Sequence, residues 1–263
     1  GDIMSDYEDF RKQICAGLHM GLSGIPWWTT DIGGFHGGQV NTDEFKELLI
    51  RWFQFGVFCP MMRSHGTEVF RELYYFGKSG EPVYDALLDA VKLRYQILPY
   101  IYSQSWQVSQ NDDSFMRALM MDFPEDKEAW NNNREYMFGP AFLVCPVVNA
   151  LYTPETANTT DPISGWDNNK KSLYQEGFKV DWSENKKYEV YLPAYKHKGK
   201  GKSANEAGAF YNFYTGERLT SGKKCMVDAP IGRMPLFVRE GSIVPMCMGN
   251  VDHANIADWK ELT

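Results

Sequence analysis

Two apolar runs that end in polar residues constrain the fold of this chain more than any other feature. GLSGIPWWTTDIGGF and VFCPMMRSHG both pass from apolar side chains into polar residues and glycine. Such runs are typical of buried parallel strands that lead into functional loops. Helical patterns flank them, so the order is helix, strand, helix, strand, helix. This alternation predicts a parallel βα fold, either part of a (β/α)8 barrel or a small open sheet.

The three helical patterns have recognisable starts. Ser5 with Glu8 predicts a capping box, Asn41 opens the second helix, and Pro82 is typical of a first helical position. We expect the third helix to kink at Pro99, because proline removes a backbone hydrogen bond. The apolar faces expected to be buried are Tyr7, Phe10, Ile14 and Leu18, then Phe45, Leu48, Leu49, Trp52 and Phe53, and then Tyr84, Leu87, Leu88, Val91, Tyr95 and Leu98.

After about Asn111 the pattern changes to short β-like runs separated by Gly, Pro and Asn. Such runs are typical of a β-sandwich. They are SFMRALMMDF, EYMFGPAFLVCPVV, FKVDW, KKYEVYLPA, AFYNFYTG, KKCMVDAP and MPLFVREGSIVPM. We therefore expect a first domain over residues 1–110, a β-sandwich over 111–248, and the start of a further, truncated β-domain over 249–263.

Composition narrows the function classes. The chain is 43% hydrophobic and 15% aromatic with a net charge of -7. It has enough apolar residues for a hydrophobic core, but it lacks the excess of basic residues that is typical of a nucleic-acid-binding protein. No apolar run is long enough to cross a bilayer. The five cysteines form no C-x-x-C pair, so we expect reduced thiols rather than a disulfide framework or a metal site.

Polar side chains stand at the ends of both predicted strands: Asp31 after the first, Arg63 and His65 after the second. Taken singly, Asp31 suits a turn before glycines and His65 suits a structural role. Repetition at two neighbouring strand ends favours a functional site, since such ends line the active sites of barrels. Trp27 and Trp28 add aromatic surface on which the C–H face of a sugar can stack. GGFHGG lacks the spacing and the lysine of a phosphate loop.

Several segments resemble glycoside hydrolase family 31. GDIMSDYEDFRKQICAGLHMGLSGIPWWTTDIGGF and RWFQFGVFCPMMRSHG are similar to its barrel strands seven and eight, and LRYQILPYIY, FMRALMMDFPED, EYMFGPAFLVCPVV, FYNFYTG and MPLFVREGSIVPM follow in family order. WWTTDIGGF and RSHG resemble its bacterial α-xylosidase and α-glucosidase branch. The resemblance implies about the last two strand–helix units of a (β/α)8 TIM barrel followed by an antiparallel β-sandwich.

The resemblance also implies roles for individual residues. The opening GD pair matches the family's W-x-G-D segment, which would make Asp2 the general acid/base. Asp31, Arg63 and His65 match residues that bind the sugar, and Trp28 and Phe35 stand where the family has the walls of the pocket. The family nucleophile, an aspartate on barrel strand four, has no counterpart in the chain and would lie upstream of Gly1.

The implied activity is that of a retaining, exo-acting α-glycosidase that removes terminal α-linked xylose or glucose without a metal or cofactor. Its partners would be a glycoside substrate and the remainder of the same enzyme chain, with a homo-oligomer left open and no nucleic acid or membrane. The compartment would be the bacterial cytoplasm or periplasm. The chain alone is expected to be inactive. An α-glucosidase and a non-catalytic carbohydrate-binding or interaction module remain alternatives.

The geometry of the site follows from the parallel strand pair. Neighbouring strands bring their ends about 4.8 Å apart, so we expect Asp31, Arg63 and His65 to face one concave site. Trp28 should contribute to that site, whereas Trp27 should pack into the helix layer. Asp2 should lie at the rim.

Overall fold

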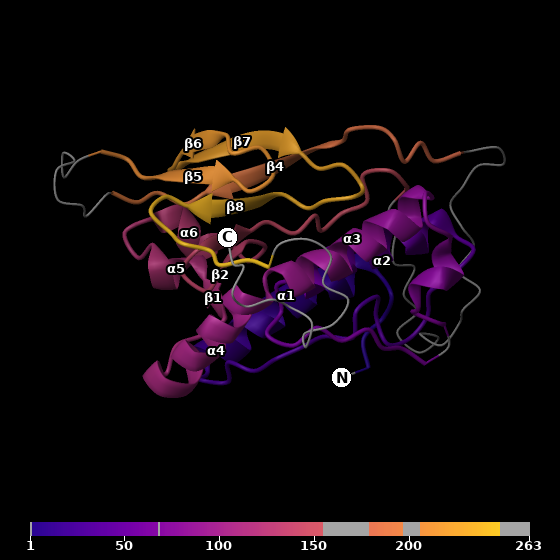
Figure 1. The fold of residues 1–263 in the computed structure, drawn as a ribbon, viewed down its shortest axis with the longest axis horizontal. Coiled ribbons are helices and arrows are strands. Elements are labelled where there is room, and N and C mark those ends of the chain that lie inside the picture. Colours follow the sequence, from indigo (N-terminus) through magenta and orange to yellow (C-terminus); the bar gives the residue numbers. More distant parts are fainter. Residues whose placement is uncertain (1, 68, 155–178, 197–205, 248–263) are drawn as a thin grey trace.

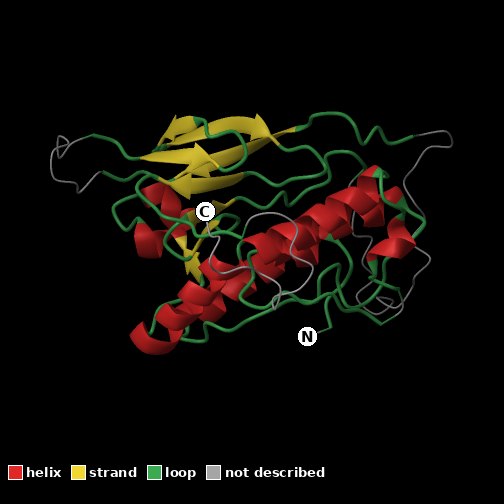
Figure 2. Cartoon of the chain, viewed as in Figure 1, coloured by secondary structure: helices red, strands yellow, loops and turns green. Residues whose placement is uncertain are grey.

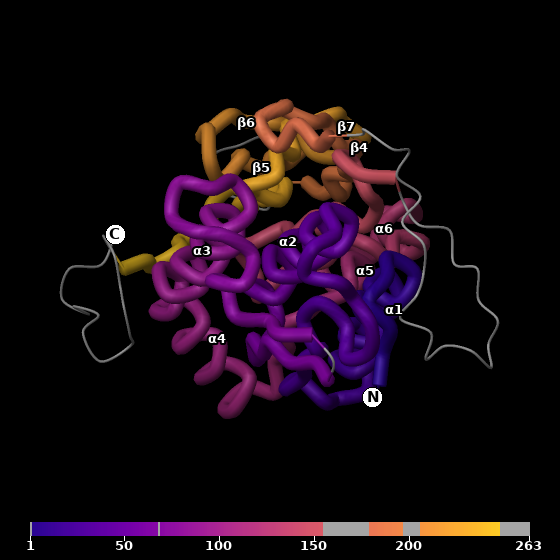
Figure 3. Tube along the Cα trace, turned by 90° about the vertical axis from the view of Figure 1, so that its right-hand side faces the viewer, coloured from indigo at the N-terminus to yellow at the C-terminus, as the bar shows by residue number. Residues whose placement is uncertain are grey.

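The computed structural model describes residues 2–67, 69–154, 179–196 and 206–247. Long helices form one layer and antiparallel strands the other, and the two layers remain distinct when the molecule is turned (Figures 1 and 3). The first half of the chain is helical and the second half is rich in strands (Figure 2).

The elements in chain order are α1 (Tyr7–Leu22), α2 (Asp43–Gly56), the 3-10 helix η1 (Leu73–Phe76), α3 (Pro82–Gln96), α4 (Leu98–Asn111), β1 (Met116–Ala118), α5 (Leu119–Asp122), α6 (Lys127–Asn131), β2 (Tyr136–Phe138), β3 (Phe142–Val144), β4 (Lys187–Leu192), β5 (Ala209–Asn212), β6 (Arg218–Thr220), β7 (Lys223–Asp228) and β8 (Leu236–Arg239).

Helix α1 begins one residue later than its predicted capping box. The carboxylate of Asp6 accepts a hydrogen bond from the Asp9 amide at 2.8 Å, and the Asp9 carboxylate accepts from the Met4 amide at 2.7 Å. The cap is therefore Asp6 and not Ser5, because an aspartate at the cap position reaches the free amide three residues on. The predicted apolar face is buried: Tyr7, Phe10, Ile14 and Leu18.

The other helices confirm the expected α2 face and correct the third helix. All five apolar residues predicted for the buried face of α2 are buried. In α3 the buried side chains are Val83, Ala86, Leu87 and Ala90. Of the predicted face, Leu87 is buried and Val91 is partly buried against the core, and the rest of the prediction is wrong. The helix also breaks at Ile97 instead of kinking. Pro99 explains the break, because its ring conflicts with a carbonyl four residues back and it has no amide to donate.

The two apolar runs are extended and parallel, but neither forms a regular strand. Their contacts are one isolated parallel bridge between Ile32 and Ser64 and backbone hydrogen bonds at 3.2 Å from the Ile32 amide to Arg63 and from the Met61 amide to Trp28. The runs contain Pro26 and Pro60, which cannot donate to a ladder. The expectation of two regular strands is therefore wrong, although their side-by-side arrangement is confirmed.

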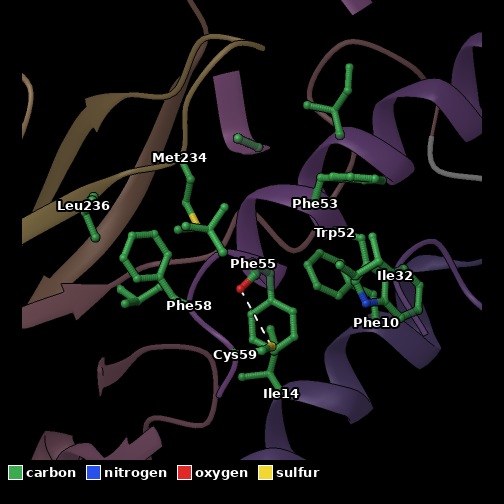
Figure 4. Close-up of a cluster of buried hydrophobic side chains, with 14 of the residues drawn as sticks. Phe10, Ile14, Ile32, Trp52, Phe53, Phe55, Phe58, Cys59, Met234 and Leu236 are labelled. Carbon is green, nitrogen blue, oxygen red and sulfur yellow. Dashed lines mark hydrogen bonds between the residues drawn. The ribbon is translucent and has the colours of Figure 1, made fainter. Parts of the chain in front are cut away.

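The strands form an antiparallel six-stranded sheet, in the order β1-β2-β3-β8-β5-β6, and a separate pair, β4 with β7. Successive residues of a strand point to opposite faces. Tyr136, Phe138 and Phe142 therefore join the core shared with the helices, whereas Met137 and Leu143 join a second core beneath the β4–β7 pair. Figure 4 shows Phe55 and Phe58 from the helical layer beside Met234 and Leu236 from the strand layer.

The strand-rich half departs from prediction in four places. LMMD forms the short helix α5 rather than a strand, and helix α6 and strand β6 were not predicted. Residues 179–182 of FKVDW form no strand, and residue 178 lies outside the described residues, as do residues 249–263. Within the described ranges, no helix is long and apolar enough to span a membrane.

Candidate active site

Asp31 and Arg63 form an ion pair at the ends of the two extended runs. Nη2 of Arg63 donates a hydrogen bond to Oδ1 of Asp31. The Asp31 side chain is only 10% exposed, whereas that of Arg63 is 54% exposed. The buried carboxylate is thus balanced by a guanidinium that reaches it from the solvent side. This pair confirms that the two predicted positions meet.

His65 lies against Phe35, which follows the first run. Their ring centroids are 5.4 Å apart, and the amide of Thr67 donates to the Phe35 carbonyl at 2.9 Å. His65 is exposed and Phe35 is half-buried. His65 also borders a cleft of 640 Å³ that Ser64, Thr67 and Phe70 help to line. The loops after the two runs are therefore joined through the backbone as well as through their rings.

The segment that carries Asp2 lies beside Phe35. The carbonyl of Ile3 accepts hydrogen bonds from the amides of Phe35 at 2.8 Å and His36 at 2.9 Å. A parallel bridge joins Met4 to His36. Asp2 itself is exposed. The predicted site residues therefore lie on three parallel segments, and the segment that contains Phe35 is the middle one.

Gly34 allows this close approach of the Asp2 segment. Its φ is +82°, which disfavours residues with a side chain, and an added Cβ would lie 2.6 Å from the Ser5 backbone. A side chain at this position would therefore displace the segment that holds Asp2.

The two tryptophans do not take the arrangement expected of them. Trp28 is half-buried and packs against the core, with its ring near Phe55 and only 2.9 Å from where a Cβ on Gly17 would stand. Trp27 is 43% exposed and meets the edge of Phe115. The expectation that Trp27 packs into the helix layer is therefore wrong, since Trp28 takes that place against Gly17 of α1.

Arg71 is a residue of this region that the strand-end pattern did not identify. It is 6% exposed, and its guanidinium donates to the carbonyls of Gly34 at 2.7 Å and Val69 at 2.8 Å. It also lies 5.0 Å from the ring centre of Phe45. The available signal was the pair Arg71 and Glu72 within the otherwise apolar and aromatic stretch VFRELYYF.

The side chains at this edge suit a ligand rich in hydroxyl groups. Asp2 and Asp31 offer carboxylate oxygens, Arg63 offers donors in a fixed fork, and Phe35 with His65 offers ring surface. Among the residues that the structure describes, no group of three His, Cys, Asp or Glu side chains is placed to hold a metal ion.

Comparisons with known proteins identify the family. Residues 1–104 match the glycosyl hydrolases family 31 TIM-barrel domain, and residues 112–244 match the glycosyl hydrolase family 31 C-terminal domain. The α-xylosidase of Saccharolobus solfataricus is 35% identical over 97% of this chain and 28% of its own length. The lysosomal α-glucosidase of Mus musculus is 28% identical over 94% of the chain and 22% of its own length.

Solved structures agree with these matches. The α-xylosidase of Xanthomonas citri is 38% identical with a TM-score of 0.72, covering 94% of this chain and 23% of that chain. An α-xylosidase from a soil metagenome, complexed with xylose, is 34% identical with a TM-score of 0.71, covering 93% and 32%. The chain thus spans less than a third of the length of these relatives. It belongs to glycoside hydrolase family 31 and comprises the C-terminal part of a (β/α)8 barrel followed by an antiparallel β-sandwich domain.

Proposed function

We propose that this chain supplies the acid/base side of the active site of a retaining, exo-acting α-glycosidase. The observation that carries the proposal is the meeting of Asp31, Arg63, Phe35 and the Asp2 segment at one edge of the barrel part. Family membership supports the reaction class. The nucleophile would come from a barrel strand outside this chain.

Retention requires two carboxyl groups roughly 5 Å apart, one attacking the anomeric carbon while the other protonates the leaving oxygen. In this mechanism Asp2 gives its proton to the departing oxygen. A covalent glycosyl–enzyme intermediate forms, and Asp2 then takes a proton from the water that breaks it. The exposed position of Asp2 suits both steps, because the leaving group and the water arrive from the solvent side.

Asp31 and His65 would hold hydroxyl groups of the sugar. Hydrogen bonds to these hydroxyls strengthen as positive charge develops on the ring, so they stabilise the transition state more than the bound substrate. Arg63 keeps the Asp31 carboxylate oriented through its guanidinium fork. Phe35 would add ring surface at the pocket wall. Trp28 would act indirectly, since it packs against the core near Phe55.

We favour an α-xyloside as substrate. The relatives from Saccharolobus and Xanthomonas are named α-xylosidases, which supports xylose. The relative from mouse is named a lysosomal α-glucosidase, which supports terminal glucose as the second candidate. The two sugars differ by one hydroxymethyl group, so the pocket wall that meets this group decides between them.

We also propose the domain division at residues 110 and 111, with the sandwich reaching residue 248. Helix α4 ends at Asn111, and Asp112 adopts a left-handed conformation with a φ of 53°. Such a residue commonly ends a helix and redirects the chain. Residues 249–263 would begin the next β-domain.

The test compares the purified chain with the enzyme that contains it together with the rest of the barrel. The larger protein should hydrolyse aryl α-xylosides with retention of configuration, followed by NMR of the first-formed sugar. The chain alone should show no turnover above background. Inversion would refute the double displacement, and turnover by the purified chain would refute the assignment of the nucleophile to another segment. Sugar binding without turnover by the larger protein would favour a non-catalytic carbohydrate-binding module.

A further inference from the structure

Arg71 connects the two loops that carry the candidate site. Its Nη2 donates to the carbonyl of Gly34, which belongs to the turn after Asp31, and its Nη1 donates to the carbonyl of Val69 on its own loop. The turn itself is closed by a hydrogen bond from the Gly34 amide to the Asp31 carbonyl at 2.9 Å. The guanidinium therefore anchors the backbone immediately after Asp31.

The same guanidinium also packs against the loop that carries His65. A Cβ on Gly66 would lie 2.7 Å from Nη2 of Arg71, so only glycine leaves room for the guanidinium there. Arg71 thus lies between Gly34, which follows Asp31, and Gly66, which follows His65. On its other side the guanidinium stacks over the ring of Phe45 from α2, 5.0 Å from the ring centre.

We infer that Arg71 is a positioning residue that sets the separation between the Asp31 carboxylate and the His65 imidazole. The inference rests on the proposed function, in which both side chains hold the sugar. Arg71 is 6% exposed and donates to the backbone carbonyls of Gly34 and Val69, so it acts through the backbone. Its planar fork donates in two directions at once, which a lysine ammonium on a flexible stem does not reproduce.

A merely stabilising arginine would behave differently, and the chain offers a matched control. Arg94 in α3 is half-buried, and it donates to the carbonyls of Val57 and Cys59 at 2.7 Å and of Pro60 at 2.9 Å. It anchors the start of the second apolar run, whereas Arg71 anchors the loops beyond the ends of both runs. Loss of either arginine should destabilise the fold, but only Arg71 should affect the site.

The experiment measures kcat and KM for an aryl α-xyloside in R71A, R71K and R94A of the enzyme that contains this chain. A misplacement of about 1 Å lowers rates about 100-fold, so R71A should lose about 100-fold in kcat/KM and R71K should retain part of it. R94A should stay within about threefold of the unaltered enzyme when assayed well below its melting temperature. If R71A does not fold, the kcat/KM of R71K is compared with that of R94A, and a larger loss in R71K supports the inference.

Hydrogen exchange gives a readout that does not depend on activity. Amides of residues 32–36 and 64–67 should exchange faster in R71A than in R94A. Unchanged exchange in these loops, or equal losses of kcat/KM in R71A and R94A, would overturn the inference. If the unaltered enzyme cleaves neither α-xylosides nor α-glucosides, the proposed function fails. The exchange comparison still decides whether Arg71 holds the two loops.

Discussion

Glu47 and Arg51 lie one turn apart on α2, are both completely buried, and bind two different segments of the strand-rich half. The Glu47 carboxylate accepts hydrogen bonds from the amides of Leu151 at 2.7 Å and Thr153 at 2.9 Å. The Arg51 guanidinium donates to the carbonyl of Ala229 at 3.0 Å. Burial lowers the pKa of Arg51, and the neighbouring Glu47 opposes that shift. This pair therefore attaches the helical layer to the strand layer.

Removal of the Glu47 carboxylate should strongly destabilise the protein. E47A leaves several buried donors without their acceptor and removes the negative charge near the buried Arg51, which typically costs about 3–5 kcal/mol. E8Q is the control, because Glu8 pairs with Lys12 on the surface of α1, where side chains are 46% and 61% exposed. Exposed pairs contribute about 0–1 kcal/mol. Urea denaturation of the chain measures both, and a loss below about 1 kcal/mol in E47A would contradict this role.

Glu135 should make stability depend on pH. Burial raises its pKa to about 7, although hydrogen bonds from the Tyr191 amide and the Asn132 side chain lower it. The folded protein therefore binds a proton more tightly than the unfolded chain, whose glutamate has a pKa of about 4.3. Stability from this group is fully present below the unfolded pKa and is lost as the pH rises to about 7.

The control for Glu135 is E135Q, in which the unfolding free energy is measured over the same pH range. Relative to E135Q, the unaltered chain should lose about 3 kcal/mol of unfolding free energy between pH 4.5 and 7, an order-of-magnitude figure from the difference in pKa between the folded and unfolded states. The two proteins are compared by how their unfolding free energy changes with pH rather than by its absolute value, because glutamine also changes the hydrogen bond to Asn132. Parallel stability curves for the two proteins over this pH range would rule out the proposed titration.

Gly34 and Gly24 have similar backbone conformations but different surroundings, so alanine at each position distinguishes backbone strain from steric crowding. Gly34 has a φ of +82° and Gly24 a φ of +78°, but only Gly34 is crowded by the Ser5 backbone. Alanine at either position costs about 1–2 kcal/mol for the left-handed conformation. G34A should cost clearly more and should lower turnover, since it displaces the Asp2 segment. Equal melting temperatures and equal kcat/KM for G34A and G24A would contradict the contact.

Local patterns predicted the elements whose residues repeat at a regular spacing. The α1 face from Tyr7 to Leu18 and the alternation of Tyr136, Met137 and Phe138 are examples, because each side chain's direction follows from its own backbone. The residue at which α1 begins was less predictable. Ser5 and Asp6 are both good caps, and the choice depends on whether the serine hydroxyl or the aspartate carboxylate reaches the next free amide.

Contacts between distant segments could not be read from such patterns. Arg71 bonds to Gly34 across 37 residues, and nothing in the spacing of either segment indicates this partner. The orientation of Trp28 likewise depends on the space beside Gly17 of α1. Asp31 and Arg63 were paired correctly because neighbouring strand ends meet in any parallel βα arrangement.

Asp2 provides the most direct test of the mechanism. In the enzyme that contains this chain, D2N removes the proton donor but keeps the size of the side chain. General acid catalysis contributes about 100- to 10,000-fold, so kcat/KM for glycosides with poor leaving groups should fall within that range. Glycosyl fluorides need little protonation to depart, so their kcat/KM should fall far less. E8Q, which changes an exposed carboxylate on α1, should leave both substrates unaffected. Equal losses in D2N for the two substrate types would show that Asp2 has another role.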